Sequence, residues 1–136
     1  MLRKFAGRLA LPLLLLASFD AMAADTRLID AVRSGDKIAA QTLLQNRVDV
    51  NAAEPDGTTA LHWAARTEDT AVVELLIRSG ANVKATNRYG VTPLYLACVA
   101  GNGGIIETLL KAGAGPNTAL PEGETDVMTA ARTGKV

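Results

Sequence analysis

The sequence is poor in the residues that most often form crosslinks or carry chemistry. It has one cysteine, Cys98, and one histidine, His62, among 136 residues. A single cysteine cannot form an internal disulfide, so packing alone must stabilise the chain. One cysteine and one histidine cannot form a closed zinc site on their own. No glycine-rich phosphate loop follows a strand either. The sequence therefore predicts no catalytic site, no cofactor and no metal site.

Aromatic side chains are scarce, and neither sign of charge dominates. Lys and Arg number 14, as do Asp and Glu. Beyond residue 23, the only aromatic residues are Trp63, Tyr89 and Tyr95. Proteins that bind nucleic acid usually present a basic face to the phosphates and aromatic side chains to the bases. We therefore expect no nucleic-acid partner.

Long hydrophobic runs are also absent, and the one short run lies near the N-terminus. Three basic residues lie within positions 1–8, an uncharged stretch covers 9–19, and Ala21-Met22-Ala23 supplies small residues at its end. This order predicts a secretory signal peptide over residues 1–23, cleaved after Ala23. Eleven helical residues span only about 16 Å, roughly half of a ~30 Å hydrocarbon core, so we expect no stable membrane span. The alternative is a leader that is retained as an anchor.

Removal of this leader would leave 11 basic and 13 acidic residues, a net charge near minus two. The short length of the leader is typical of bacterial leaders. We expect an exported protein that is periplasmic or secreted.

A 33-residue repeat runs through the rest of the chain without insertion or deletion. Gly57, for example, recurs as Gly90 and Gly123. A fixed period of this size predicts a solenoid, in which each repeat buries its apolar face against its neighbours. Residues 24–136 form the predicted repeat domain, and its repeats are expected at about 25–53, 54–86, 87–119 and 120–136. The first is an N-terminal cap without a hairpin.

Apolar residues within the repeats recur at i, i+3 and i+4, the spacing of helices with one buried face. In the second repeat two such groups are Leu61, Ala64, Ala65 and Val73, Leu76, Ile77. In the flanking repeats they are Leu28, Ala31, Val32, then Ala40, Leu43, Leu44, and Ile106, Leu109, Leu110. Each repeat is therefore predicted to contain two antiparallel helices and a turn.

Two features depart from an even array. Gly103 and Gly104 open the second helix of the third repeat, and each should weaken it by roughly 0.5–1 kcal/mol relative to alanine. We expect this helix, around residues 105–110, to be the loosest internal one. The fourth repeat reaches Val136 before its second helix begins. We expect the chain to be the front part of a longer protein, with a natural half-repeat end as the alternative.

Two segments resemble the T-P-L-H-x-A signature of the ankyrin repeat family. Residues 92–97 read T-P-L-Y-L-A, and residues 59–64 read T-A-L-H-W-A. Together with endings of the Leu-Leu-x-x-Gly-Ala type in register, the resemblance covers about Asp25 to Gly134. It implies an all-α ankyrin repeat solenoid of helix-turn-helix units joined by β-hairpin-like turns. Departures at Arg47, Gly115-Pro116 and Asp126 concern local helix ends.

The resemblance also implies where a partner would bind. Ankyrin arrays usually bind proteins with the hairpin tips and the exposed side of the first helices, which together form a concave surface. The matching tip positions are Pro55, Asp56, Thr58, Arg88, Tyr89, Val91, Glu122 and Glu124, and the matching first-helix positions are Arg66, Thr67, Val99 and Ala100. Arg88 and Tyr89 are the best anchors, because arginine and tyrosine carry a disproportionate share of interface energy. The alternative is that they are only solvated loop residues.

Three residues that could carry chemistry are better explained by structure. The resemblance implies that His62 hydrogen-bonds neighbouring turns. Trp63 is expected to pack between helices and not to form a ligand platform. Cys98 takes a core alanine position, which favours a buried small hydrophobe over a reactive thiol.

The sequence therefore favours a monomeric, non-catalytic module that binds a protein partner of unknown identity. One alternative is a non-catalytic repeat segment of a longer exported protein or enzyme, whose remainder lies beyond residue 136. A further alternative is a small inhibitor or immunity-type partner of an exported enzyme.

Overall fold

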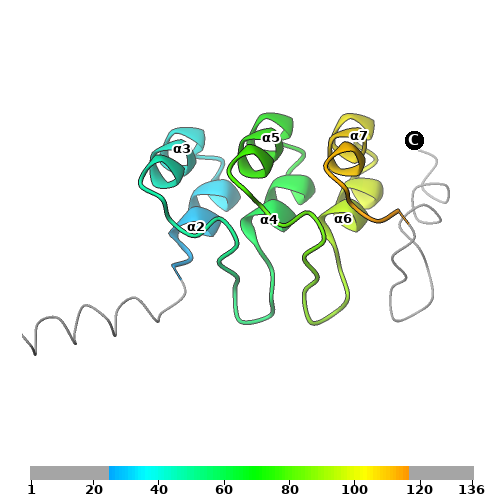
Figure 1. Ribbon diagram of the computed structural model, residues 1–136, viewed down its shortest axis with the longest axis horizontal. Helices are drawn as coiled ribbons and strands as arrows, with labels where there is room; N and C mark the ends of the chain where they lie inside the picture. The colour runs from blue at the N-terminus through cyan, green and yellow to red at the C-terminus, as the bar shows by residue number, and fades with distance from the viewer. Residues whose placement is uncertain (1–24, 117–136) are drawn as a thin grey trace, which may run out of the picture.

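Residues 25–116, which the computed structural model describes, contain six α-helices in three antiparallel pairs. The first helices of the pairs lie in one layer, the second helices lie in another, and long loops project beyond the first layer (Figure 1). The helices are α2 (Arg27–Ser34), α3 (Lys37–Gln45), α4 (Ala60–Arg66), α5 (Thr70–Arg78), α6 (Pro93–Ala100) and α7 (Gly103–Lys111). This arrangement confirms the predicted all-α solenoid. The predicted leader and the fourth repeat lie outside the described residues.

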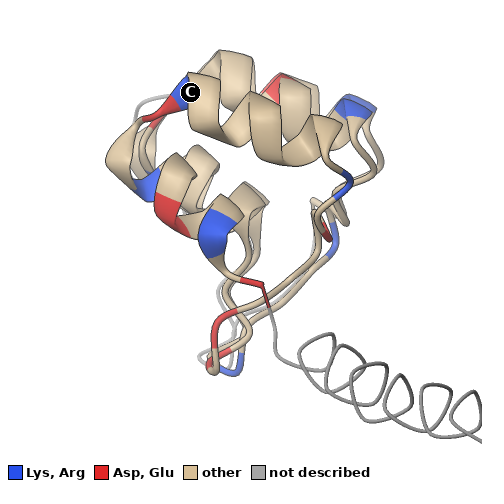
Figure 2. Ribbon diagram, turned by 90° about the vertical axis from the view of Figure 1, so that its left-hand side faces the viewer, with Lys and Arg blue, Asp and Glu red and all other residues tan. Residues whose placement is uncertain are grey.

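Successive repeats have almost the same orientation. Viewed along the array, the helix pairs superpose and the loops extend together to one side (Figure 2). The loop before α4 closes as a minimal hairpin, with an antiparallel bridge between Ala53 and Thr59. No helix within residues 25–116 is long and apolar enough to cross a membrane.

The core runs continuously through the three pairs. Leu28, Leu61 and Leu94 occupy the same position of α2, α4 and α6, and each is at most 2% exposed. Complete burial of one leucine contributes about 1.5–3 kcal/mol. The buried alanines Ala64 and Ala97 allow neighbouring first helices to approach closely. Each repeat thus depends on the next to cover its apolar face.

The predicted stripe of α7 is wrong at one position. Leu110 is 40% exposed, whereas Ile105 is fully buried beside Ile106 and Leu109. In α5, Val72, Val73 and Leu76 form the matching buried set, and Ile77 is only half-buried. The buried stripe is therefore shifted by one residue toward the N-terminus of each of these helices.

Side chains cap the starts of α6 and of all three second helices. Thr92 accepts a hydrogen bond from the backbone N–H of Tyr95 (3.1 Å), and Pro93 takes the first helical position as predicted. The second helices begin after Asp36, Asp69 and Asn102, which lie 33 residues apart. Each accepts the backbone N–H three residues later, at 2.9, 3.2 and 3.1 Å respectively. This recurrent cap satisfies N–H groups that a helix start leaves free.

Two helix ends lack the expected glycine but keep its conformation. Gly80 and Gly113 have φ of +94° and +101° after α5 and α7, and Arg47, in the same position after α3, has φ of +58°. Glu68 has φ of +60° after α4. Substitution of the glycine therefore leaves the chain path unchanged, at a cost in backbone strain.

Hydrogen bonds connect one repeat to the next. The side chain of Asn51 donates to the carbonyl of Gly80 (3.2 Å) and accepts from the N–H of Asn82 (2.7 Å). The two hairpins also approach closely, because a Cβ at Gly57 would lie 3.1 Å from Cα of Asn87. Such contacts fix the relative orientation of neighbouring repeats.

Candidate functional site

A hollow of about 280 Å³ lies between the second and third repeats, on the face formed by the hairpins and first helices. Five of the ten tip and first-helix residues expected to bind a partner within the described range line it, namely Asp56, Thr58, Arg66, Tyr89 and Val91. The other five, Pro55, Thr67, Arg88, Val99 and Ala100, are not among its lining residues. The lining also includes five residues that were not predicted as partner contacts, Glu54, His62, Trp63, Asn87 and Leu96. Glu122 and Glu124 lie outside the described residues.

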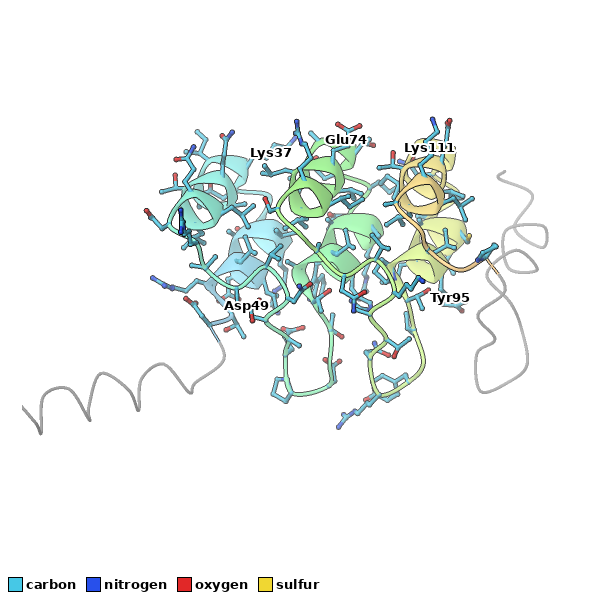
Figure 3. All side chains as sticks on the ribbon, viewed as in Figure 1. Lys37, Asp49, Glu74, Tyr95 and Lys111 are labelled. Carbon is cyan, nitrogen blue, oxygen red and sulfur yellow. The ribbon has the colours of Figure 1, made fainter. Side chains whose placement is uncertain are left out.

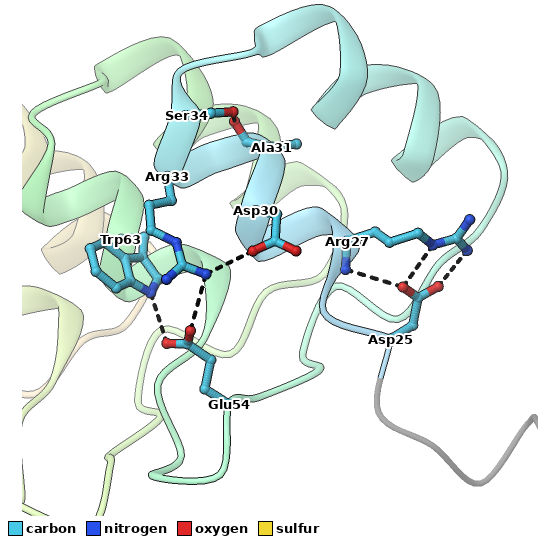
Figure 4. Close-up of polar contacts among 8 residues, drawn as sticks. All are labelled: Asp25, Arg27, Asp30, Ala31, Arg33, Ser34, Glu54 and Trp63. Carbon is cyan, nitrogen blue, oxygen red and sulfur yellow. Dashed lines mark hydrogen bonds and ion pairs between the residues drawn. The ribbon is translucent and has the colours of Figure 1, made fainter.

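Trp63 lines the hollow and forms the centre of a cluster of polar side chains (Figure 4). The guanidinium carbons of Arg33 and Arg66 lie 5.0 and 5.3 Å from the centroid of its ring. Its indole N–H donates to Glu54 (3.0 Å). The half-buried ring also packs against the core. The ring therefore packs against the core, as predicted, and it also lines the hollow.

The two arginines of this cluster differ in their partners. Arg33 forms ion pairs with Asp30 (2.7 Å) and Glu54 (3.3 Å). Arg66 is exposed, and among residues 25–116 its guanidinium has no hydrogen bond or ion pair. The two arginines are 33 residues apart, so their recurrence on the first helices was visible in the sequence.

His62 connects α4 to the hairpin of the next repeat. Its Nδ1 accepts the backbone N–H of Thr59 (3.1 Å), and the Thr59 hydroxyl lies 2.8 Å from the same nitrogen. Its Nε2 lies 2.9 Å from the carbonyl oxygen of Val91. Because a backbone N–H must donate and a carbonyl must accept, the ring is neutral with its proton on Nε2. Burial lowers the pKa of His62 below its usual value.

The tip of the third-repeat hairpin pairs a third arginine with a second aromatic ring. Arg88 donates to the Tyr89 hydroxyl (2.8 Å), and its guanidinium carbon lies 5.0 Å from the centroid of that ring. Tyr89 is 55% exposed. The N–H of Arg88 donates to the carbonyl of Asp56 (2.8 Å), which joins the two hairpin tips. The backbone N–H of Thr58 lowers the pKa of the Asp56 carboxyl, which therefore stays ionised.

The opposite side of the array is charged. Lys37, Glu74 and Lys111 lie on the side of the second helices, away from the hairpins (Figure 3). Lys37 pairs with Asp69 (3.3 Å), and Lys111 pairs with Glu107 (2.7 Å). Two aromatic residues, Trp63 and Tyr89, line the hollow on the other side.

Cys98 is 2% exposed, in the core alanine register of α6, which is the position that the sequence predicted. Within residues 25–116, no group of three or more His, Cys, Asp or Glu residues is placed to hold a metal ion.

Comparison with known protein families gives one match. The family model for ankyrin repeats, described as three copies, matches residues 28–120 of this 136-residue chain. Comparison with curated proteins gives no match. Ankyrin repeats are generally protein–protein interaction modules and are typically non-catalytic. Because the match covers more than half of the sequence and agrees with the fold, this chain belongs to the ankyrin repeat family.

Proposed function

We propose that this protein binds a protein partner through its hairpin tips and the concave surface of its first helices, with the hollow at the centre of the contact. The observation that supports this proposal most directly is the hollow itself. It lies between Trp63 on one side and Tyr89 on the other. Tryptophan, tyrosine and arginine are the residues that most often dominate interface energies.

The chemistry of this face changes along the array. The first-helix position held by Asp30 in the first repeat is Trp63 in the second and Leu96 in the third. In parallel, Arg33 and Arg66 are followed by Val99, which is 44% exposed. A partner surface that matches this face would be polar at one end and apolar at the other, and this asymmetry would fix its orientation.

The test is a site-specific crosslink followed by affinity measurements. A photoreactive amino acid at position 89 should capture a partner, whereas the same group at position 78, on α5, should not. With the captured partner purified, Tyr89→Ala should weaken binding by about tenfold or more, the loss typical of an interface anchor. Lys84→Ala, on the exposed loop after α5, is the matched control. Equal losses of affinity in Tyr89→Ala and Lys84→Ala would show that Tyr89 is only a solvated loop residue.

The compartment of the protein is part of the same proposal. The leader-like residues 1–23 favour export to the periplasm or the medium, with removal of the leader. The test is the intact mass of the protein recovered from the extracytoplasmic fraction of its source. A mass equal to that of residues 24–136 would support export and cleavage of a short array. A much larger mass would instead favour the alternative, a repeat segment of a longer exported protein.

A further inference from the structure

Resting on the proposed function, we propose that the hollow takes a partner segment in which an apolar side chain lies next to a carboxylate. The apolar side chain would fill the hollow, and Arg66 would bind the carboxylate. This specifies the chemistry of the partner, which membership of the repeat family does not.

The positive part of the site is an arginine held in place without a counter-ion. The guanidinium carbon of Arg66 lies over the Trp63 ring, 5.3 Å from its centroid, and within residues 25–116 no acceptor bonds to the guanidinium. A cation–π contact of this kind places the guanidinium without using its N–H groups. A planar arginine with open donors matches a carboxylate through two parallel hydrogen bonds.

The two carboxylates that line the hollow, those of Glu54 and Asp56, already have hydrogen-bond partners. One oxygen of Glu54 accepts from the Trp63 indole, and the other pairs with Arg33. Asp56 accepts from Thr58 at the hairpin tip. It precedes α4, whereas Arg66 is the last residue of that seven-residue helix, which spans about 10 Å.

The carbonyl groups at the end of α4 have a hydrogen-bond donor other than Arg66. The hydroxyl of Thr67 donates to the carbonyls of Trp63 (3.0 Å) and Ala64 (3.3 Å). These are carbonyls of the last turn, where an arginine side chain often donates. Arg66 is therefore left to bind an external acceptor.

The apolar part of the site is suited to one side chain. Trp63, Val91 and Leu96 line the hollow together with the ring of Tyr89. Its volume of about 280 Å³ lies just below the range of about 300–1,000 Å³ that is usual for small-molecule pockets. A partner's leucine, methionine or phenylalanine would bury its apolar surface here, with the acidic neighbour directed at Arg66.

The experiment selects ligands without assuming a partner. Random linear peptides displayed on phage are enriched on the intact protein, and the selected peptides are synthesised for titration. We expect them to share an acidic residue beside an apolar one. Arg66→Gln should weaken their binding by about tenfold or more, because hydrogen bonds between charged groups are the strong ones. Arg66→Lys should weaken it less, and added salt should weaken binding to the wild type.

The matched control is Arg78→Gln. Arg78 is the last residue of α5, as Arg66 is of α4, and it is also exposed. It lies on the second-helix layer, so its loss should leave peptide affinity unchanged. A charge exchange excludes a folding artefact: Arg66→Glu should lose the acidic peptide and gain affinity for a peptide whose acidic residue is replaced by lysine.

The remaining outcomes separate this inference from the proposed function. If the selected peptides carry no shared acidic residue, or bind Arg66→Gln as tightly as the wild type, while Tyr89→Ala weakens them, the carboxylate inference is overturned and the concave binding surface stands. If neither Tyr89→Ala nor Arg66→Gln changes their affinity, binding occurs elsewhere and both proposals are wrong.

Discussion

At the scale of single residues, His62 is a buried side chain whose hydrogen bonds depend on its protonation state. Its Nδ1 accepts a hydrogen bond from the backbone N–H of Thr59. A proton on this nitrogen would break that hydrogen bond and place two N–H donors against each other. Burial lowers the pKa of the ring in the folded state, whereas in the unfolded chain it stays near 6.5. Below about pH 6.5 the unfolded chain therefore binds a proton that the folded chain resists. The stabilisation from neutral His62 is complete above this pH and is lost as the pH falls toward the folded pKa.

We predict that the free energy of unfolding decreases between pH 7.5 and pH 5.5, measured by urea titration. His62 is the only histidine, so this decrease should be assignable to it. His62→Gln should lower stability at pH 7.5 by about 1–3 kcal/mol, the cost of leaving buried polar groups unsatisfied. It should also flatten the pH dependence over this range. An equally steep dependence in His62→Gln would show that other groups are responsible.

Arg47 carries backbone strain that a glycine would relieve. Its φ of +58° lies in the left-handed region, where the equivalent residues are Gly80 and Gly113. We predict that Arg47→Gly raises the free energy of unfolding by about 0.5–1 kcal/mol. Gly80→Ala is the reverse control, because a Cβ there meets no atom within 4 Å and only the backbone conformation would be strained. It should lower stability by a similar amount, and a stability loss in Arg47→Gly would contradict the strain argument.

At the scale of elements, α5 and α7 form a closely matched pair. Both begin after a capping side chain and bury three residues at equivalent positions. They differ at their first two residues, which are Thr70 and Ala71 in α5 but Gly103 and Gly104 in α7. The glycines increase the entropy lost when the helix forms, so α7 should open more often.

We predict faster hydrogen exchange of backbone amides at residues 105–110 than at 72–77. Gly103→Ala should slow exchange in α7, since a Cβ at this position meets no atom within 4 Å. This variant separates the effect of the glycines from the position of α7 in the array. Equal protection of the two helices in the wild-type protein would disprove the prediction.

At the scale of the whole molecule, stability depends on the contacts between neighbouring repeats. Each first helix packs against the first helix of the next repeat, and α5 packs against α7. Asn51 adds two hydrogen bonds between the first and second repeats. In such an array, a weakened junction should loosen the repeats beside it more than distant ones.

We predict that Asn51→Ala increases hydrogen exchange in α2 and α3 more than in α6 and α7. The loss of global stability should be about 1 kcal/mol, as expected for partly exposed hydrogen bonds. Asn46→Ala is the control, because its exposed side chain has no hydrogen bond to another repeat within residues 25–116. A uniform increase in exchange along the array would mean that the repeats unfold as one unit.

Most of the fold was predictable because the repeat samples the same pattern several times. The spacing of Leu61 and Ala64 recurs after 33 residues as Leu94 and Ala97. Because an accidental helical pattern would not recur in register, this repetition makes the helix assignment reliable. The error at Leu110 arose because the spacing i, i+3, i+4 does not define which edge of the apolar stripe packs against the neighbouring layer. Ile105, which is buried instead, is also apolar, so the sequence left open which of the two residues faces the core.

The sequence by itself determined the helix pairs, their period, the hairpins and the side of the array that carries candidate binding residues, since all of these follow from local spacing and turn chemistry. Only the tertiary structure decided which of those residues share a hollow. The contacts of Trp63 with Arg33 and Glu54 join side chains from the first helix layer and a hairpin. The open donors of Arg66 likewise depend on which carboxylates the fold engages elsewhere. Such pairings depend on the distance and direction of side chains between repeats, and no local pattern in the sequence contains that information.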